Sequence, residues 1–379
     1  MGHDVAVIGA GVVGSAIALA LARRGASATL LDADSEPGLA ASGTNSGILH
    51  TGFDSEPGEL ETALILRAAE LRDPVLERLG VPAVRCGAEM RPADEAQREA
   101  VAALSENAAR NGVRTSLSGD GALTVPGEAI TDPVRFTLAL ASAAGRHGAE
   151  LRTRFAVAGI RADGDHLTVT SSSGAEVECS VAVNCAGLGA GSVARMVGDE
   201  SFVYPRKGEF LVFDPPDGPM DRILLPVPTK RTKGVLVFPT TDGKLIAGPT
   251  AVDSDDPADW SVRPEARAEI IGKASAVYPD LASSQPIFAY AGLRPAGRGS
   301  NYVIGASAAC PRLINVAAIR STGLTASLGI AAHVTDLVAA AGIDLGPEEE
   351  LLPGKAPDPG GPWWRRTADH RAEAEKYGR

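Results

Sequence analysis

Three glycines near the N-terminus form the clearest chemical pattern in this chain. A short apolar run at residues 5–8 is followed by the segment GAGVVG at residues 9–14 and then by a helix-forming stretch. Gly9 permits a tight turn, and Gly11 lets a pyrophosphate group approach the main chain at the positive end of the helix. Gly14 allows that helix to pack closely on the strand. The pattern predicts a strand, a phosphate-binding turn and a helix.

An acidic residue completes this unit. The segment ATLLDAD at residues 28–34 is a second apolar strand that ends in Asp32. A carboxylate at this place can hold the two hydroxyls of a ribose. A glycine turn with no ligand would not need the acid. Strand, glycine turn, helix, strand and acid together predict that the chain binds a dinucleotide.

Composition limits the other functions. With 379 residues the chain is long enough for two packed lobes. Its net charge of −11 argues against nucleic-acid partners and against an anionic membrane surface. No apolar stretch looks long and uninterrupted enough to span a bilayer. Cys86, Cys179, Cys185 and Cys310 are scattered without ligand spacing, so we expect buried thiols, a reducing cytoplasm and no metal site.

Two further segments favour a flavin over a nicotinamide. AVNCAGLGAG at residues 182–191 puts glycines beside the nucleotide a second time, and IRSTGLTAS at residues 319–327 opens another helix. The N–H groups at the start of that helix stabilise negative charge, which a reduced flavin ring develops and a nicotinamide does not. The chain also lacks a second GxGxxG unit that could hold a separate nicotinamide cofactor.

The remaining elements predict an α/β protein in which a Rossmann-like FAD-binding lobe is interleaved with a mostly antiparallel β-sheet substrate lobe. Helices are expected at about residues 59–79, 93–110, 132–148 and 324–341, a hairpin turn at Ser173-Gly174, and strands within 207–289. We expect the FAD-binding domain at residues 1–85, 148–204 and 290–345, the substrate domain at residues 86–147 and 205–289, and a C-terminal tail at residues 346–379.

Segments spread over almost the whole chain carry a family resemblance. They are VAVIGAGVVGSAIALALARRG, SGTNSGILHTG, ITDPVRF, NCAGLGAG, PRKGEFLVFD, LIAGPTAVD, GLRP and IRSTGLTASLGIA. The chain resembles the D-amino-acid oxidase superfamily of FAD-dependent oxidoreductases, and within it the branch of glycerol-3-phosphate dehydrogenase and L-2-hydroxyglutarate oxidase. The first segment is common to many FAD and NAD proteins, whereas GILHTG, RKGEFLVFD and RSTGLTAS are more specific.

The resemblance implies that FAD binds in an extended form. Asp32 is expected at the adenosine ribose, residues 42–48 along the pyrophosphate and the ring, the main chain of Val157 at the adenine, and residues 321–325 beneath the pyrimidine edge of the ring. The full set of expected cofactor-binding residues is Gly9, Ala10, Gly11, Val12, Val13, Gly14, Asp32, Ala33, Ser42, Gly43, Thr44, Asn45, Ser46, Gly47, Ile48, Val157, Ala186, Gly187, Ser321, Thr322, Gly323, Leu324 and Thr325.

A catalytic base is expected directly after the segment that passes the ring. Oxidation of an alcohol by a flavin needs a C–H bond directed at flavin N5, a base for the hydroxyl proton, and cations for an anionic group. His50 occupies this place, and histidine accepts protons near neutral pH. The alternative is a histidine that only hydrogen-bonds the flavin or packs in a loop.

Three cations are candidates for holding an anionic substrate. Arg294, in the GLRP segment, lies where the antiparallel lobe returns to the flavin lobe. A guanidinium there either clamps a carboxylate or phosphate or forms a salt bridge that closes the two lobes. Arg320 either anchors substrate or caps the preceding strand, and Lys207 either faces substrate or is a solvated surface lysine.

These features predict an FAD-dependent dehydrogenase or oxidase that oxidises a small anionic 2-hydroxy acid or polyol phosphate by hydride transfer to flavin N5. The alternatives are an amine or amino-acid oxidase of the same superfamily and a flavin subunit that relays electrons within a complex. In relatives with an iron–sulfur extension, a pair like Tyr377-Gly378 precedes a cysteine-rich domain. Because this sequence stops at Arg379, we expect its electrons to pass to oxygen, a quinone or a separate redox partner.

Overall fold

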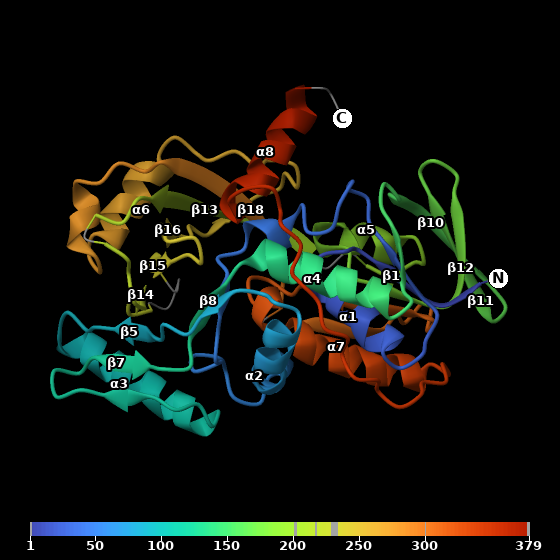
Figure 1. The fold of residues 1–379 in the computed structure, drawn as a ribbon, viewed down its shortest axis with the longest axis horizontal. Helices are drawn as coiled ribbons and strands as arrows, with labels where there is room; N and C mark the ends of the chain where they lie inside the picture. Colours follow the sequence, from blue (N-terminus) through green and yellow to red (C-terminus); the bar gives the residue numbers. More distant parts are fainter. Residues whose placement is uncertain (1, 201–202, 217, 229–233, 300, 377–379) are drawn as a thin grey trace.

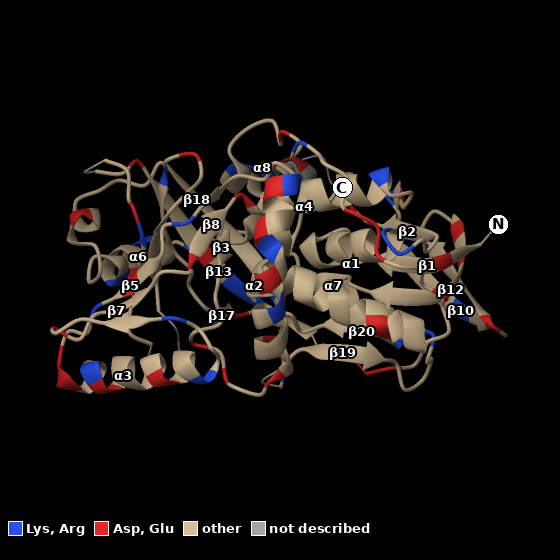
Figure 2. Ribbon diagram, turned by 60° about the horizontal axis from the view of Figure 1, so that its bottom comes forward, with Lys and Arg blue, Asp and Glu red and all other residues tan. Residues whose placement is uncertain are grey.

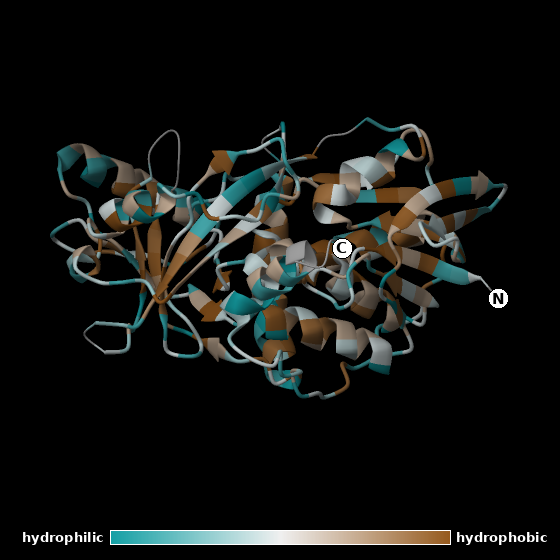
Figure 3. Cartoon of the chain, turned by 90° about the horizontal axis from the view of Figure 1, so that it is seen from above, coloured by the Kyte–Doolittle hydropathy of each residue, from teal (hydrophilic) through white to brown (hydrophobic). Residues whose placement is uncertain are grey.

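Two sheets lie next to each other along the longest axis of the molecule (Figure 1). The computed structural model describes residues 2–200, 203–216, 218–228, 234–299 and 301–376. The Tyr377-Gly378 pair therefore lies outside the described residues. Brown, hydrophobic segments are concentrated in the strands of both sheets, whereas teal segments lie mostly in loops and outer helices (Figure 3).

The first sheet has eight strands and a parallel centre. The parallel strands follow the order β9-β2-β1-β12-β20, with β1 in the middle between β2 and β12. Antiparallel strands extend it, β19 beside β20 and the pair β10-β11 beside β12. The bounds are β1 His3–Ile8, β2 Ala28–Leu31, β9 Glu150–Arg152, β10 Val157–Asp163, β11 His166–Ser171, β12 Glu176–Asn184, β19 Val303–Ala306 and β20 Leu313–Ala317.

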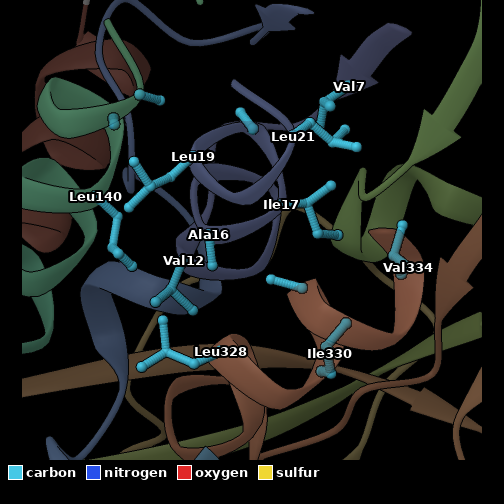
Figure 4. Close-up of a cluster of buried hydrophobic side chains, with 14 of the residues drawn as sticks. Val7, Val12, Ala16, Ile17, Leu19, Leu21, Leu140, Leu328, Ile330 and Val334 are labelled. Atoms are coloured by element: carbon cyan, nitrogen blue, oxygen red, sulfur yellow. The ribbon is translucent and has the colours of Figure 1, made fainter. Parts of the chain in front are cut away.

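Helices cover one face of this sheet around a common apolar core. They are α1 (Val12–Ala22), α2 (Leu60–Arg78), α4 (Pro133–Arg146) and α7 (Gly323–Ala340), while the short α5 (Ala190–Arg195) packs on the other face. Helix α1 is apolar on all sides, which is typical of a helix surrounded by protein. Figure 4 shows Leu19 of α1 near Leu140 of α4, and Ile17 of α1 facing Ile330 and Val334 of α7.

Helix α7 is long and apolar enough to cross a membrane by length and composition alone, with a mean hydropathy of 1.3 over 18 residues. The expectation that no apolar stretch is long enough to span a bilayer was therefore wrong for this helix, by length and composition. In the fold, α7 packs against both α1 and α2, and more than half of it is buried. Its apolar composition is accounted for by its place in the core.

The second sheet has nine strands and is mostly antiparallel. Its longest pairing joins β13 and β18 from Val203↔Gly297 to Val212↔Phe288. Helix α6 (Ala266–Ala274) packs on this sheet, and α3 (Glu95–Arg110) flanks it with side chains of both charges at its surface (Figure 2). The strands are β5 Ala88–Met90, β6 Ser116–Leu117, β7 Leu123–Val125, β13 Val203–Phe213, β14 Ile223–Leu225, β15 Leu236–Pro239, β16 Leu245–Gly248, β17 Val252–Asp253 and β18 Phe288–Gly297.

A small third sheet lies between the two cores. It consists of β3 (Ile48–Leu49), β8 (Ala129–Thr131) and β4 (Ala83–Val84). Because side chains alternate along a strand, Ile48 and Ile130 join the core of the second sheet while Leu49 and Ala129 join the helical core. The segments that flank β3 and β8 are thereby placed at the junction of the two lobes.

The α/β fold with a Rossmann-like lobe and an antiparallel sheet is confirmed, whereas the domain boundaries stay a prediction. Two elements pack with the lobe other than the one predicted for them. Helix α4 was expected in the substrate domain but packs on α1, and β18 was assigned mostly to the FAD-binding domain but pairs with β13 along its whole length. The expected tail also contains a helix, α8 (Trp363–Lys376), which stands at the top of Figure 1.

Candidate active site

A cavity of about 560 Å³ lies at the carboxyl ends of the parallel strands. It is bounded by the turn after β1, the residues after β2, the short 3₁₀ helix η1 (Ala41–Thr44), residues 155–157, η2 (Gly187–Gly189) and the loop between β20 and α7. This is the crevice in which open parallel sheets bind nucleotides.

The glycine turn fits a phosphate group held against the main chain. Gly9 has a φ of +108°. A Cβ on Gly9 would overlap the main chain of Cys185, and a Cβ on Gly14 would overlap the main chain of Gly9. Gly11 is the N-cap of α1 and offers no side-chain cap. Ser42 Oγ accepts a hydrogen bond from Val12 N at 2.9 Å, which ties η1 to the first turn of the helix. The start of α1 therefore keeps N–H groups available for an anion.

Asp32 is positioned at the end of β2 as expected for a ribose ligand. One carboxylate oxygen accepts a hydrogen bond from Ala10 N at 2.6 Å, and the other accepts one from Asp34 N at 2.8 Å. Burial raises the pKa of Asp32, although these two N–H groups and the Arg371 cation favour the ionised form. Asp32 thus faces the cavity with its orientation fixed by the main chain.

The loop before α7 has an unusual main-chain conformation. Ala318 and Arg320 have φ values of +57° and +56°, in the left-handed region that side-chain-bearing residues rarely adopt. Both residues line the cavity, as do Gly323 and Leu324 in the first turn of α7. Such strain persists only where the surrounding structure enforces it, and it is often found at functional sites. The helix start expected beneath the flavin ring is therefore held by a strained loop.

His50 forms a pair with a buried carboxylate. Its Nδ1 lies 2.9 Å from Oε2 of Glu128, whose side chain is fully buried. The other carboxylate oxygen of Glu128 accepts hydrogen bonds from Thr51 N at 2.6 Å and Thr51 Oγ1 at 2.8 Å. The His50 side chain is 28% exposed, and His50 follows the cavity-bordering segment without being one of the residues that line the cavity. Sequence reasoning missed Glu128, which lies 78 residues from His50.

Two further side chains hold this pair in place. The guanidinium of Arg72, in α2, donates to the carbonyl of His50 at 2.8 Å and to that of Gly127 at 3.1 Å. The hydroxyl of Thr325, in α7, accepts from His50 N at 3.1 Å and donates to the carbonyl of Ile48 at 3.1 Å. His50 is therefore tied to the same helix start that lines the cavity, and Arg72 links the two segments that carry the pair.

Arg294 is held by carbonyl groups and not by an acid. It donates to the carbonyls of Thr250 at 2.6 Å and Lys207 at 3.1 Å. The two nearby carboxylates belong to other cations, since Asp253 pairs with Arg206 at 2.5 Å and Asp259 with Lys207 at 2.5 Å. Burial, with a further contribution from the Arg206 charge, lowers the pKa of Arg294 to about 10. No salt bridge of Arg294 closes the lobes within the described part of the chain.

The face of β18 that carries Arg294 lies against η1. Leu293 and Pro295 line the cavity, so strand alternation places Arg294 on the opposite side. Gly292 is on that same side, and a Cβ added to it would overlap the side chain of Thr44 in η1. Tyr290, two residues further, stacks on Phe210 with ring centroids 4.8 Å apart in the core. Arg294 is thus outside the cavity lining but on the strand face that contacts η1.

The other two candidate cations are paired with acids. Arg320 lines the cavity and forms an ion pair with Glu61, at the start of α2. The Glu61 carboxylate also accepts a hydrogen bond from Thr322 Oγ1 at 2.7 Å. Lys207 is only 2% exposed and is bound by Asp259 and by the carbonyl of Ser261 at 3.0 Å. The alternative of a solvated surface lysine is therefore wrong, because the ammonium group is enclosed by the 259–261 loop.

Many of the expected cofactor-binding residues line this cavity: Gly9, Gly11, Val12, Val13, Gly14, Asp32, Ala33, Ser42, Asn45, Val157, Ala186, Gly187, Gly323 and Leu324. The others are not among the lining residues: Ala10, Gly43, Thr44, Ser46, Gly47, Ile48, Ser321, Thr322 and Thr325. Lining residues that sequence reasoning missed include Phe155, Pro257, Ala258, Trp260 and Arg371. The contacts of individual residues with FAD stay predictions.

Sequence relatives are named as dehydrogenases of glycerol 3-phosphate and of L-2-hydroxyglutarate. The chain is 29% identical over 354 residues to a glycerol 3-phosphate dehydrogenase of Caloramator mitchellensis, covering 88% of this chain and 73% of that one. It is 26% identical over 270 residues to the L-2-hydroxyglutarate dehydrogenase of Escherichia coli K12, covering 66% of this chain and 64% of that one.

Solved structures share the fold. An FAD-bound L-α-glycerophosphate oxidase of Mycoplasma pneumoniae superposes with a TM-score of 0.87 at 23% identity, covering 94% of this chain and 100% of that one. Glycine oxidase of Geobacillus kaustophilus superposes with a TM-score of 0.80 at 22% identity, covering 90% and 96%. The profile of the family described as "DAO: FAD dependent oxidoreductase" matches residues 4–337. The chain therefore belongs to the DAO family of FAD-dependent oxidoreductases, and it is an FAD-dependent dehydrogenase or oxidase.

Proposed function

We propose that this enzyme oxidises the hydroxyl-bearing carbon of a small anionic compound, a 2-hydroxy acid or a polyol phosphate, with His50 as the base. The observation that carries the proposal is the pairing of His50 with the buried carboxylate of Glu128 at 2.9 Å. A histidine that only packed in a loop would not need a buried acid with two further hydrogen bonds from Thr51.

The pair is suited to removing a hydroxyl proton. Oxidation of the alcohol to a carbonyl compound releases one proton from oxygen and one hydride from carbon, and bound FAD supplies the acceptor for the hydride. Because an ionised Glu128 only accepts hydrogen bonds, Nδ1 of His50 carries the hydrogen in this pair. Nε2 is then left with its lone pair as the proton acceptor. After proton transfer, the carboxylate stabilises the imidazolium.

Unneutralised positive charge supports an anionic substrate. Arg294 donates to carbonyls, and the carboxylates near it are paired with Arg206 and Lys207. Because Nε and Nη2 of Arg294 already donate to the carbonyls of Arg206, Lys207 and Thr250, Nη1 is the nitrogen left to donate to a carboxylate or phosphate. Glycerol 3-phosphate and 2-hydroxyglutarate, after which the sequence relatives are named, both carry a hydroxyl group and negative charge. Arg320 is a second, weaker candidate because Glu61 already pairs with it.

Oxidation of an amine or amino acid is the second candidate, favoured by the superposition with glycine oxidase. An amine that reacts in its neutral form does not need a base for a hydroxyl proton. The two candidates therefore differ in their dependence on His50.

Anaerobic bleaching of the flavin tests the proposal. The purified enzyme is mixed in turn with 2-hydroxy acids, glycerol phosphates and amino acids. We expect rapid bleaching by a hydroxylated anion and a reduction rate about 10²–10⁴-fold lower in His50→Ala, since this is the usual contribution of a general base. His166→Ala, at an exposed strand start, is the matched control. Bleaching by an amino acid with an unchanged rate in His50→Ala would establish the second candidate instead.

The electron acceptor is read from the same preparation. Once the flavin is reduced, air and a soluble quinone are added separately, and the return of the oxidised spectrum is followed. Bleaching by none of the compounds, with FAD bound, would contradict the proposal and favour a subunit that relays electrons.

A further inference from the structure

Helix α8 is a folded element beyond the part of the chain that matches the family. The match ends at residue 337, whereas α8 spans Trp363–Lys376. Its first turn is anchored in the core of the second sheet. Trp363, 2% exposed, meets Tyr290 edge-on at 6.1 Å, and Trp364 packs on Phe288 at 5.4 Å. Two buried tryptophans make a firm attachment, so α8 is part of the packed molecule.

The middle of α8 runs along the loop that follows β2. Arg366 donates to Glu36 at 2.6 Å and to the carbonyl of Pro37 at 3.2 Å. Thr367 is 1% exposed and lies directly against Gly43 of η1, where no side chain could be added. The two residues before Gly43, Ala41 and Ser42, line the cofactor cavity. Helix α8 therefore covers the outer side of the segment that borders FAD.

Arg371 brings α8 into the cavity itself. Its guanidinium donates to both oxygens of Asp34, at 3.2 and 2.7 Å, and to the carbonyl of Leu39 at 2.8 Å. The guanidinium also lies over the ring of Trp260, 5.1 Å from its centre. Arg371, Asp34 and Trp260 all line the cavity, although they come from three distant parts of the chain. They meet beside Asp32, the expected ribose ligand.

One donor of Arg371 remains without a partner. Its Nε is buried and makes no hydrogen bond within the described part of the chain. Because this nitrogen is covered by protein, a ligand in the cavity meets other atoms of Arg371, which lines the cavity and carries positive charge. The adenosine half of FAD offers phosphate and ribose oxygens that such a cation attracts.

We propose that α8 closes the adenosine end of the FAD site and that Arg371 contacts the adenosine half of the cofactor. The proposal concerns cofactor retention and does not depend on which substrate is oxidised. It makes the C-terminal helix a part of the binding site that the family match does not cover.

Binding of FAD and of ADP to the apoprotein tests this. ADP carries the adenosine half without the flavin. We expect Arg371→Ala to weaken both ligands by about tenfold or more in titration calorimetry, the range for loss of a hydrogen bond to a charged group. Arg365→Ala is the matched control, because Arg365 lies on the same helix, packs over Phe288 and is absent from the cavity lining. Equal ADP affinity in Arg371→Ala and the wild type would overturn the proposal.

Hydrogen exchange of the unmodified chain gives an independent answer if Arg371→Ala fails to fold. Adding ADP to the apoprotein should slow amide exchange across residues 363–376, because the ligand binds against Arg371 and holds the helix in place. Exchange in α8 that is the same with and without ADP would also overturn the proposal.

Discussion

The cofactor cavity is bounded mainly by main chain and small side chains, whereas the proposed substrate side depends on a few charged side chains held by distant partners. Around α1, the contacts that matter are made by Gly9, Gly11 and Gly14 and by N–H groups of neighbouring residues. On the other side, His50 depends on Glu128 and Arg294 depends on carbonyls of the adjacent strand and loop. We therefore expect the first region to bind through shape and dipoles, and the second through individual charges.

This difference separates the effects expected from substitutions. Changes on the substrate side should alter the rate of flavin reduction or the KM while FAD stays bound. Changes on the cofactor side should alter the affinity for FAD while a fully loaded enzyme keeps its rate. A substitution that moved both quantities together would break the comparison.

The largest effect after loss of His50 is expected at Arg294. Removing one partner of a buried charged pair costs about 3–5 kcal/mol, so Arg294→Ala should lower kcat/KM for the anionic substrate by roughly a hundredfold to several thousandfold. Arg294→Lys keeps the charge but loses the planar fork and should mainly raise the KM. Arg320→Ala, whose cation already pairs with Glu61, should have a smaller effect. Steady-state kinetics with the best compound of the panel provide the measurement.

Two results decide the role of Arg294. The melting temperature of Arg294→Ala must be checked, because the carbonyls of Thr250 and Lys207 lose their donor. If a folded Arg294→Ala reduces its flavin as fast as the wild type, the anion is held elsewhere, and Arg320 or Lys207 becomes the first candidate.

A smaller effect, on affinity alone, is expected at Asp32. Loss of a hydrogen bond to a charged group costs about 1.5–3 kcal/mol, so Asp32→Asn should weaken FAD binding by roughly tenfold to a hundredfold. Burial raises the pKa of this carboxyl in the apoprotein. If FAD prefers the ionised form, wild-type affinity should be constant above that raised pKa and fall as the pH decreases through it. Asp32→Asn should lack this dependence, and an unchanged affinity would place the acid away from the ribose.

The parts of the site that sequence reasoning found share one property, which is that each is marked by a pattern within a short segment. The glycine turn, Asp32 at the end of β2 and the start of α7 are each contained in a short segment with a recognisable pattern. The main helices, the 173–174 turn and the strands β13, β15 and β16 of the second sheet were also predictable from local periodicity.

The parts that were missed depend on contacts between distant segments. Glu128 stands between a Pro-Gly turn and the short β8, and nothing nearby marks it as the partner of His50, 78 residues away. An acidic residue in an otherwise apolar stretch was the one available signal. Trp260 and Arg371 have no local signal at all, since Arg371 meets Asp34 and the ring of Trp260 only across the fold. The pairing of β18 with β13 likewise could not be read from either strand alone.

A double-mutant cycle on His50 and Glu128 tests the central claim most directly. Flavin reduction by the best hydroxylated anion is followed by stopped flow in the wild type, His50→Ala, Glu128→Gln and the double variant, all loaded with FAD. If Glu128 acts through His50, Glu128→Gln should slow reduction by about tenfold to a hundredfold in the wild type, and it should have almost no further effect once His50 is absent. Equal slowing by Glu128→Gln in both backgrounds would contradict the account.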